Sequence, residues 1–305
     1  MKTKFFTPIL LLITLSAIPL SCQSKKQIRP AEEEALQQGT TIISDSIRFC
    51  ESTCPYRGGI LIANFGTEQL NPLNTKGRGY IAYHKDNRTE ILIPADGNLS
   101  APKGMFVRDR HLFVCDVNKI VVYNLQVPGK VPQVVLLPEG NLFVNDLAAE
   151  GNTLYASVTN TGKIFSTDIS DPDAVGIPVE WVNITGPNGL IIEGGTMYVA
   201  SYPADGKTTD NNVIQIADLG NPVPEKFITT PGQYDGIALS ADKKTMYITN
   251  WTPAQVCTVN MNTGKVMPLD IKPEIPLTGP ADITVAPGRM YIPDLPNSRV
   301  IVYPL

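Results

Sequence analysis

Zinc-type ligands are scarce in this sequence. It contains two histidines, His84 and His111, and no pair of cysteines separated by two residues. Structural zinc sites are usually built from such cysteine pairs together with histidines. Neither histidine lies at the repeated position described below, so we expect no zinc site.

Basic runs and long amphipathic helices are also missing. The net charge is −4, and no cluster of lysine and arginine follows the N-terminal segment. Nucleic-acid binding requires a positively charged surface, so we expect no nucleic-acid partner. Short β-rich runs alternate instead with glycine, proline, asparagine and aspartate, which indicates an all-β fold with many turns.

Cysteines are few, and their spacing does not favour disulfides. There are five, of which Cys22 belongs to the N-terminal segment. Cys50 and Cys54 would lie about 13 Å apart in an extended strand, too far for a bridge unless a turn intervenes. Cys115 and Cys257 lie in apolar strand contexts, where we expect buried core thiols.

The N-terminus has the pattern of an export signal. Residues 1–21 carry Lys2 and Lys4 ahead of an apolar run, and Ser21 precedes Cys22. A small residue before cysteine is the bacterial lipoprotein cleavage pattern, although Pro19 stands where an aliphatic residue is usual. Ordinary cleavage with an incidental cysteine is the alternative. We predict a signal peptide over 1–21, lipidation at Cys22 and a tether over 22–39. The protein would then be a periplasmic or outer-membrane lipoprotein, held at the bacterial cell envelope by its lipid alone.

The remaining residues, 40–305, contain a unit that recurs six times. Each copy is a short apolar strand, a turn and a second β-rich strand, and consecutive copies begin 42 to 52 residues apart. A period of this size with about four strands per copy predicts an all-β, six-bladed β-propeller. In blade four we expect strands at 188–192, 197–201, 212–216 and 226–229.

The last blade is one strand short at the C-terminus. Its final strand runs through Arg299–Tyr303, and the chain ends two residues later. We predict that an N-terminal strand within Thr40–Ile47 completes this blade. Such a closure would tie the ends of the ring together and remove an open sheet edge.

One position of the repeat carries the functional prediction. In five copies the residue that opens the first strand lies nine positions before the second strand, and in the fifth copy it lies eleven before it. These six residues are Glu51, Lys103, Asn145, Asn188, Asp235 and Ala281. First strands line the central channel of a propeller, so the six side chains should form a ring.

Four of the six residues offer oxygen atoms, two of them as carboxylates. Glu51, Asn145, Asn188 and Asp235 form a set suited to a divalent cation such as Ca²⁺. Asparagine and aspartate are also common before strands, where their side chains satisfy turn amides. Four of them in one register favours the metal ring, and Asp235 could both hold the ion and accept a proton.

These residues resemble a known family. Glu51, Asn145-Asp146, the segment 186–190 and the segment 234–237 look like motifs of the senescence-marker-protein/gluconolactonase family of six-bladed propellers. The resemblance covers about residues 45–305. It implies a catalytic divalent ion held by Glu51, Asn145, Asn188 and Asp235, with Asp235 as base or nucleophile.

The sequence departs from the family pattern at two positions that concern the substrate. Phe143 stands where the lactonases carry an arginine that holds the sugar acid. Lys103 would place an ammonium group in the ring, where it could pair with Glu51 or Asp235 and replace the metal. Alternatively, Lys103 could hold an anionic group of the substrate.

Two functions follow from these observations. The first is an exported, metal-dependent hydrolase of lactones or other small esters, with Lys103 and Phe143 near the substrate. The second is a non-catalytic propeller that binds a glycan or another envelope protein. In either case we expect a monomer.

Overall fold

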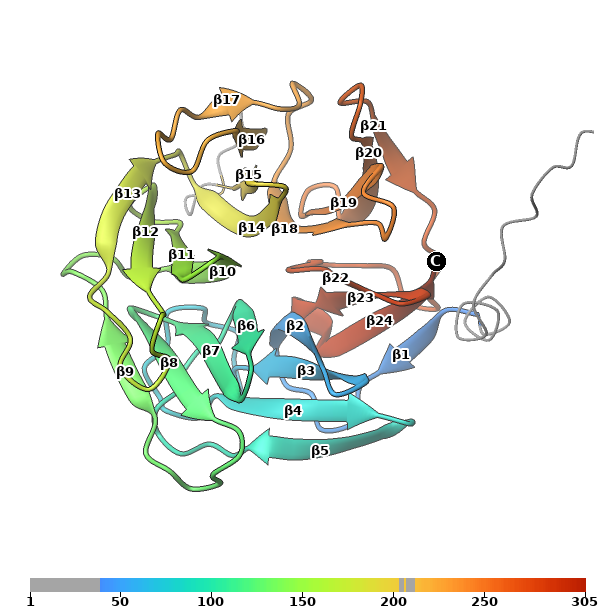
Figure 1. Ribbon diagram of the computed structural model, residues 1–305. Helices are drawn as coiled ribbons and strands as arrows, with labels where there is room; N and C mark the ends of the chain where they lie inside the picture. The colour runs from blue at the N-terminus through green and yellow to red at the C-terminus, as the bar shows by residue number, and fades with distance from the viewer. Residues whose placement is uncertain (1–38, 203–205, 207–211) are drawn as a thin grey trace, which may run out of the picture.

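The fold is a ring of six four-stranded antiparallel sheets around a central axis, as predicted (Figure 1). A computed structural model describes residues 39–202, 206 and 212–305. The predicted signal peptide, Cys22 and all but the last residue of the tether lie outside this range. Within it, no helix is long and apolar enough to span a membrane.

Each blade is a meander whose first strand is innermost. Blade one holds β2 (Cys50–Tyr56), β3 (Gly59–Asn64), β4 (Tyr80–Lys85) and β5 (Arg88–Ile93). Blade two holds β6 (Met105–Arg108), β7 (His111–Asp116), β8 (Lys119–Asn124) and β9 (Gln133–Leu136). Blade three holds β10 (Val144–Glu150), β11 (Thr153–Val158), β12 (Lys163–Asp168) and β13 (Val179–Asn183).

The second half of the ring repeats this plan. Blade four holds β14 (Pro187–Glu193), β15 (Thr196–Ser201), β16 (Val213–Ile216) and β17 (Glu225–Lys226). Blade five holds β18 (Tyr234–Leu239), β19 (Thr245–Asn250), β20 (Gln255–Asn260) and β21 (Val266–Leu269). Blade six holds β22 (Thr284–Ala286), β23 (Arg289–Asp294), β24 (Arg299–Pro304) and β1 (Thr41–Ile43), with the short 3-10 helix η1 (Leu295–Asn297) between β23 and β24.

The N-terminal closure of blade six is confirmed. Strand β1 pairs with β24, placing Ile42 opposite Ile301, and the two strands lie side by side in Figure 1. The strand is shorter than the predicted Thr40–Ile47 because a turn follows it, in which the Ile47 N–H bonds to the Ser44 carbonyl. Ile43 and Ile47 are nevertheless both buried.

The outer strand of blade four also differs from the prediction of 226–229. Strand β17 covers only Glu225–Lys226. The N–H groups of Phe227 and Ile228 both donate to the carbonyl of Val213, which ends the regular ladder at that point.

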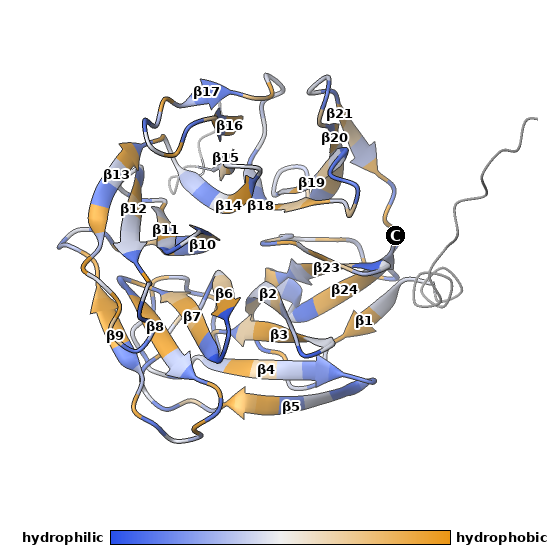
Figure 2. Ribbon diagram, viewed as in Figure 1, coloured by the Kyte–Doolittle hydropathy of each residue, from blue (hydrophilic) through white to orange (hydrophobic). Residues whose placement is uncertain are grey.

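Apolar side chains fill the spaces between neighbouring blades. Phe113 of blade two and Leu154 of blade three, for example, belong to one buried cluster. Figure 2 shows hydrophobic residues along many of the strands and hydrophilic residues at many of the turns. The four cysteines of the described chain, Cys50, Cys54, Cys115 and Cys257, are buried free thiols, which agrees with the predicted absence of disulfides.

Candidate functional site

Irregular inner strands bring the predicted ring residues to the axis. In β2, β10, β14 and β18 the pairing register shifts by a bulge that contains the ring residue and the residue after it. A bulge sets two consecutive residues against one partner, so both can point away from the sheet in a similar direction. This explains why Asn145 and Asp146 both line the same cavity.

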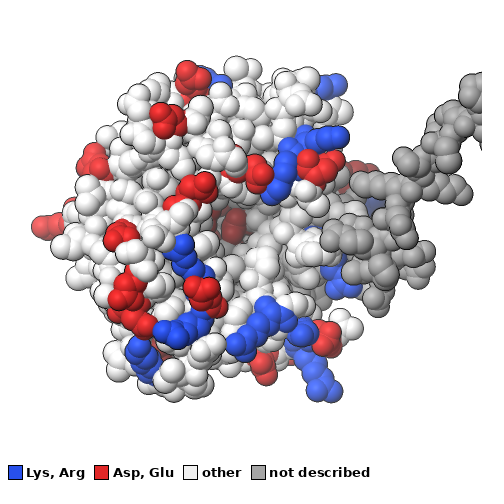
Figure 3. Space-filling model, in the orientation of Figure 1, with Lys and Arg blue, Asp and Glu red and all other residues white. Residues whose placement is uncertain are grey.

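The four predicted metal ligands lie together around one small central cavity. The cavity is lined by Glu51, Gly104, Asn145, Asp146, Asn188, Gly189, Asp235 and Asp282. Figure 3 shows an acidic side chain inside the hollow at the centre of the molecule. The lining side chains leave almost no space for a water-sized molecule, whereas sites that enclose an organic ligand offer roughly 300 Å³ or more. A small ion is the largest ligand that these side chains could surround, and a larger molecule would have to lie above them.

The hydrogen bonds of these four side chains leave oxygen atoms available. The Asn145 amide nitrogen donates to the Thr159 hydroxyl at 3.1 Å, so its carbonyl oxygen remains unused. The side chain of Asn188 makes no hydrogen bond to another described residue. Glu51 Oε2 is buried and has no hydrogen-bond partner among the described residues. An unpaired buried oxygen is costly and calls for a ligand or a proton.

Burial strongly perturbs the acidic groups of the cavity. Burial and the carboxylate of Asp235 raise the pKa of Glu51 well above its usual value, against the opposing charge of Lys103. Burial raises the pKa of Asp235 to about 7, although the Trp251 N–H bond opposes this shift. Four carboxylates, those of Glu51, Asp146, Asp235 and Asp282, share the cavity. Their negative charge favours either bound protons or a bound cation.

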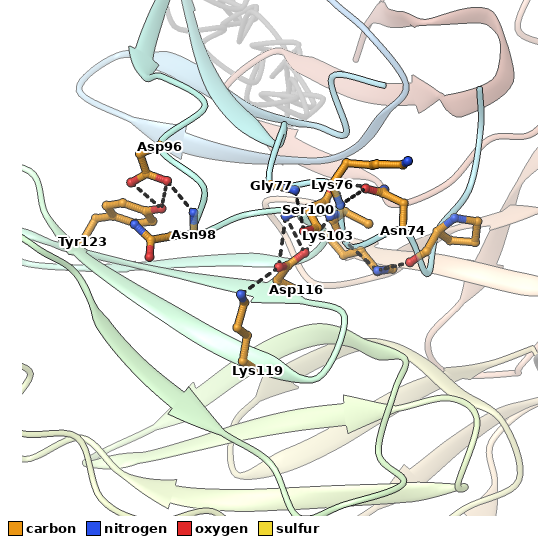
Figure 4. A network of polar contacts seen from close by, with 12 residues as sticks. Asn74, Lys76, Gly77, Asp96, Asn98, Ser100, Lys103, Asp116, Lys119 and Tyr123 are labelled. Atoms are coloured by element: carbon orange, nitrogen blue, oxygen red, sulfur yellow. Dashed lines mark hydrogen bonds and ion pairs between the residues drawn. The ribbon is translucent and has the colours of Figure 1, made fainter. Parts of the chain in front are cut away.

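Lys103 does not pair with the ring carboxylates. Its ammonium group donates to the carbonyls of Ala101 at 2.9 Å and Pro72 at 3.1 Å (Figure 4). It also lies 5.6 Å from the ring centroid of Phe65 and 5.0 Å from that of Phe143. Lys103 forms no ion pair with a described residue, so the structure does not show the alternative in which it pairs with Glu51 or Asp235 in place of a metal. Burial lowers the pKa of Lys103, and the charge of Glu51 opposes this effect.

The loop that holds Lys103 is itself fixed by a buried carboxylate. Asp116, the last residue of β7, accepts hydrogen bonds from the N–H groups of Ser100 and Ala101 (Figure 4). Asp294, the last residue of β23, accepts from Thr278 and Gly279 in the same way. Asn64 and Asn250 occupy this position in blades one and five and accept from Arg48 and Gln233. This second repeated polar position, which the sequence analysis missed, anchors the loops that lead into the inner strands.

Two cavity residues, Asp146 and Asp282, were not predicted as site residues. Asp146 Oδ2 accepts the Leu190 N–H at 2.7 Å, and Asp282 accepts from the Ser52 hydroxyl. Burial and the charge of Asp282 raise the pKa of Asp146, and burial raises that of Asp282 to about 6. The position after each ring residue holds only Ser, Gly or Asp in this sequence, and that pattern could have revealed them.

At Gly236, which follows the ring residue of blade five, the close approach of the next blade requires glycine. A Cβ atom added to Gly236 would lie 2.5 Å from the Cα atom of Asp282 in the next blade. Hydroxyl groups tie the blades together at the same level. Ser157 accepts from the Asp146 N–H and donates to the carbonyl of Asn188. The inner strands therefore form a rigid frame for the cavity.

The donor set fits a hard divalent cation, with Glu51, Asn145, Asn188 and Asp235 as the residues that would hold it. Among the described residues, no group of three or more histidine, cysteine, aspartate and glutamate side chains could hold a metal. Half of the predicted ligands are asparagines, Asn145 and Asn188, whose amide oxygens can also hold a hard cation. The unpartnered Glu51 Oε2 atom is an independent sign that this oxygen needs a proton or a positively charged ligand.

Comparisons with known proteins identify the fold only. No protein-family model and no curated protein matches the chain. Among solved structures, a chain of a nidogen/laminin complex is similar, with a TM-score of 0.55 and 12% sequence identity over 83% of this chain and 85% of that chain. At this identity the likeness shows a shared six-bladed propeller and says nothing of function.

Proposed function

We propose that this protein is a metal-dependent hydrolase of small lactones or other esters, with Ca²⁺ as the metal. The observation that carries the proposal is the buried, unpartnered Glu51 Oε2 atom in a cavity shared with Asn145, Asn188 and Asp235. The motif resemblance to the senescence-marker-protein/gluconolactonase family supports the same assignment.

The reaction would draw on the charge and the proton-accepting capacity of the cavity. When bound, a divalent cation supplies Lewis acidity toward an ester carbonyl and lowers the pKa of a bound water. Asp235, whose pKa is raised to about 7, is suited to accept a proton near neutral pH. Trp251 donates to Asp235 Oδ2, and the other oxygen of this carboxylate remains available for the proton.

The substrate would lie at the mouth of the channel rather than within it. Phe143, Tyr202 and Trp251 are partly exposed, and Tyr202 and Trp251 lie with their ring centroids 6.2 Å apart. These rings suit a substrate with an apolar part. Lys103 is only 1% exposed, so it would act on an anionic group through its charge, while Phe143 could contact the substrate directly.

A binding function without catalysis is the second candidate. The observation that favours it is the tight closure of the ring, in which Glu51, Asn145, Asn188 and Asp235 are each at most 6% exposed. A buried cation would then stabilise the propeller, whose outer loops would bind a glycan or an envelope protein. The similar nidogen chain comes from a complex with laminin, which shows that this fold can serve protein binding.

Metal content and hydrolysis together test the two candidates. The purified protein should contain calcium in an amount close to one ion per chain, and it should hydrolyse members of a lactone panel until EDTA is added. Asn188→Ala should reduce both metal content and hydrolysis, whereas Glu180→Gln on the exposed surface of β13 should change neither. Bound metal without hydrolysis of any lactone or ester would favour the binding function, and absence of metal would contradict the hydrolase.

Export, lipidation at Cys22 and residence at the cell envelope follow from residues outside the described structure. With one small cavity closed by six blades of a single chain, the proposed site needs no second copy, and we propose a monomer.

A further inference from the structure

Trp251 is placed directly against the one ring carboxylate assigned as proton acceptor. It follows β19, and its indole N–H donates to Asp235 Oδ2 at 2.5 Å. Among the described residues it is the only hydrogen-bond donor to this carboxylate. The other tryptophan, Trp181, donates to the backbone carbonyl of Leu219, which is an ordinary way to satisfy an indole N–H.

Blade six leaves the space that the indole ring occupies. Its ring position is Ala281, which has no polar group, and Trp251 packs against the apolar cluster that contains Ala281 and Leu295. A Cβ atom added to Gly279 would lie 2.6 Å from the indole ring. Because Gly279 and Ala281 have no large side chains, the indole ring of Trp251 in blade five can lie over Ala281, the ring residue of blade six.

We propose that Trp251 is a positioning residue for Asp235. The N–H group holds Oδ2, so that Oδ1 is turned toward the cavity that Asp235 shares with Glu51, Asn145 and Asn188. This inference rests on the proposed metal-binding function and names the residue that preorganises one of its ligands. Outer-shell hydrogen bonds of this kind typically change metal affinity by roughly 10- to 100-fold.

The two tryptophans provide a matched pair of variants for a spectroscopic test. Tb³⁺ replaces Ca²⁺ at oxygen sites, and its emission is excited by a nearby indole. In Trp181→Phe, Trp251 is the remaining tryptophan, and we expect Tb³⁺ emission that Ca²⁺ competes away. In Trp251→Phe we expect this emission to disappear and the Kd for Ca²⁺, measured by calorimetry, to rise roughly 10- to 100-fold. Trp181→Phe should leave that Kd unchanged.

A double-mutant cycle separates positioning from general packing. If Trp251 acts through Asp235, the Trp251→Phe change should weaken Ca²⁺ binding in the wild type and add little further loss in an Asp235→Ala background. A merely structural role would produce the same loss in both backgrounds and overturn the proposal. Circular dichroism checks that each variant is folded. If Trp251→Phe does not fold, Gly279→Ala, which displaces the indole ring without removing it, takes its place in the cycle.

The outcomes also distinguish this inference from the proposed function. A wild-type protein that binds neither Ca²⁺ nor Tb³⁺ overturns both. A wild-type protein that binds Ca²⁺, with an unchanged Kd in Trp251→Phe, overturns the positioning role and leaves the metal site intact.

Discussion

The ammonium group of Lys103 lies 2.9 Å from the carbonyl oxygen of Ala101, two residues earlier in the chain. The Pro72 carbonyl and the faces of Phe65 and Phe143 complete its surroundings. These neutral groups hold the cation away from direct contact with the carboxylates of the ring. Its charge nevertheless acts on Glu51 and Asp235 through space, as it would on any cation bound between them.

Removing this charge should tighten the binding of a divalent ion. At an effective dielectric constant near 20, a unit charge roughly 6 Å from a divalent ion repels it by about 5–6 kcal/mol before screening. We therefore expect Lys103→Met to lower the Kd for Ca²⁺ at least about tenfold at low salt, as measured by calorimetry. Lys119→Met, which removes a lysine paired with Asp116 instead, is the control. Weaker binding in Lys103→Met would show that the lysine supports the ring rather than opposing the ion.

Replacing Asp235 by asparagine should affect hydrolysis more than binding. Asp235→Asn keeps an oxygen in place but removes the proton acceptor and one of the two carboxylates in the predicted ligand set. We expect the Kd for Ca²⁺ to rise, and the rate of lactone hydrolysis at saturating Ca²⁺ to fall by roughly 100-fold or more. A rate that recovers fully once Ca²⁺ is saturating would show that Asp235 serves only as a ligand.

Cys22 should determine where the protein is found in the cell. Lipidation requires this thiol, so Cys22→Ala should leave the precursor uncleaved or release the protein from membranes. Fractionation followed by mass spectrometry of the mature N-terminus measures this directly. An unmodified N-terminus at another residue of the wild-type protein would contradict the lipoprotein assignment.

The repeat made the fold predictable, because one spacing recurs six times and few architectures have a period of that length. The same spacing brought Glu51, Asn145, Asn188 and Asp235 together, since equivalent positions of a propeller converge on its axis. The N-terminal strand was predicted because Arg299–Pro304 would otherwise leave an open sheet edge. Its length was not, because the turn after Ile43 depends on local bonds that the sequence does not reveal.

The environment of Lys103 could not be predicted from the repeat. Its position in the ring suggested an ion pair with a carboxylate. Its ammonium group instead donates a hydrogen bond to the Pro72 carbonyl and lies over the ring of Phe143. Trp251 was missed for a similar reason, since its contact with Asp235 depends on space left by Gly279 in another blade. Contacts made across blades by loops follow no periodic pattern, so sequence spacing alone cannot reveal them.

Removing β1 should destabilise the propeller, whereas removing the tether should not. Strand β1 pairs with β24 and buries Ile43. Deleting residues 22–38 should leave the free energy of unfolding unchanged. Deleting residues 22–44 should lower the free energy of unfolding by at least about 2 kcal/mol, because the buried Ile43 side chain is lost and the edge of β24 is exposed. Urea unfolding curves of the two truncated proteins provide the measurement. Equal stability would contradict a structural role for the closure.

The carboxylates of the cavity predict how stability depends on pH in the absence of metal. The pKa of Asp235 is raised to about 7 and that of Asp282 to about 6, in both cases mainly by burial. In the unfolded chain both would titrate near their usual value of about 3.9. The folded protein therefore retains protons that the unfolded chain has lost. These groups contribute stability that is fully present below about pH 4 and is lost as the pH rises through the folded values.

In EDTA, the free energy of unfolding should accordingly fall between about pH 4 and pH 7. Asp235→Asn or Asp282→Asn should each make this fall shallower. Saturating Ca²⁺ should also reduce it, because a bound cation stabilises the ionised carboxylates. Glu180→Gln is the matched control. Hydrogen bonding to Lys163 lowers the pKa of the exposed Glu180 carboxylate, so Glu180 affects the free energy of unfolding only in acid. Urea unfolding curves at each pH measure the slope. A slope that is the same in all variants would show that the cavity carboxylates titrate normally and that the channel is more hydrated than its burial indicates.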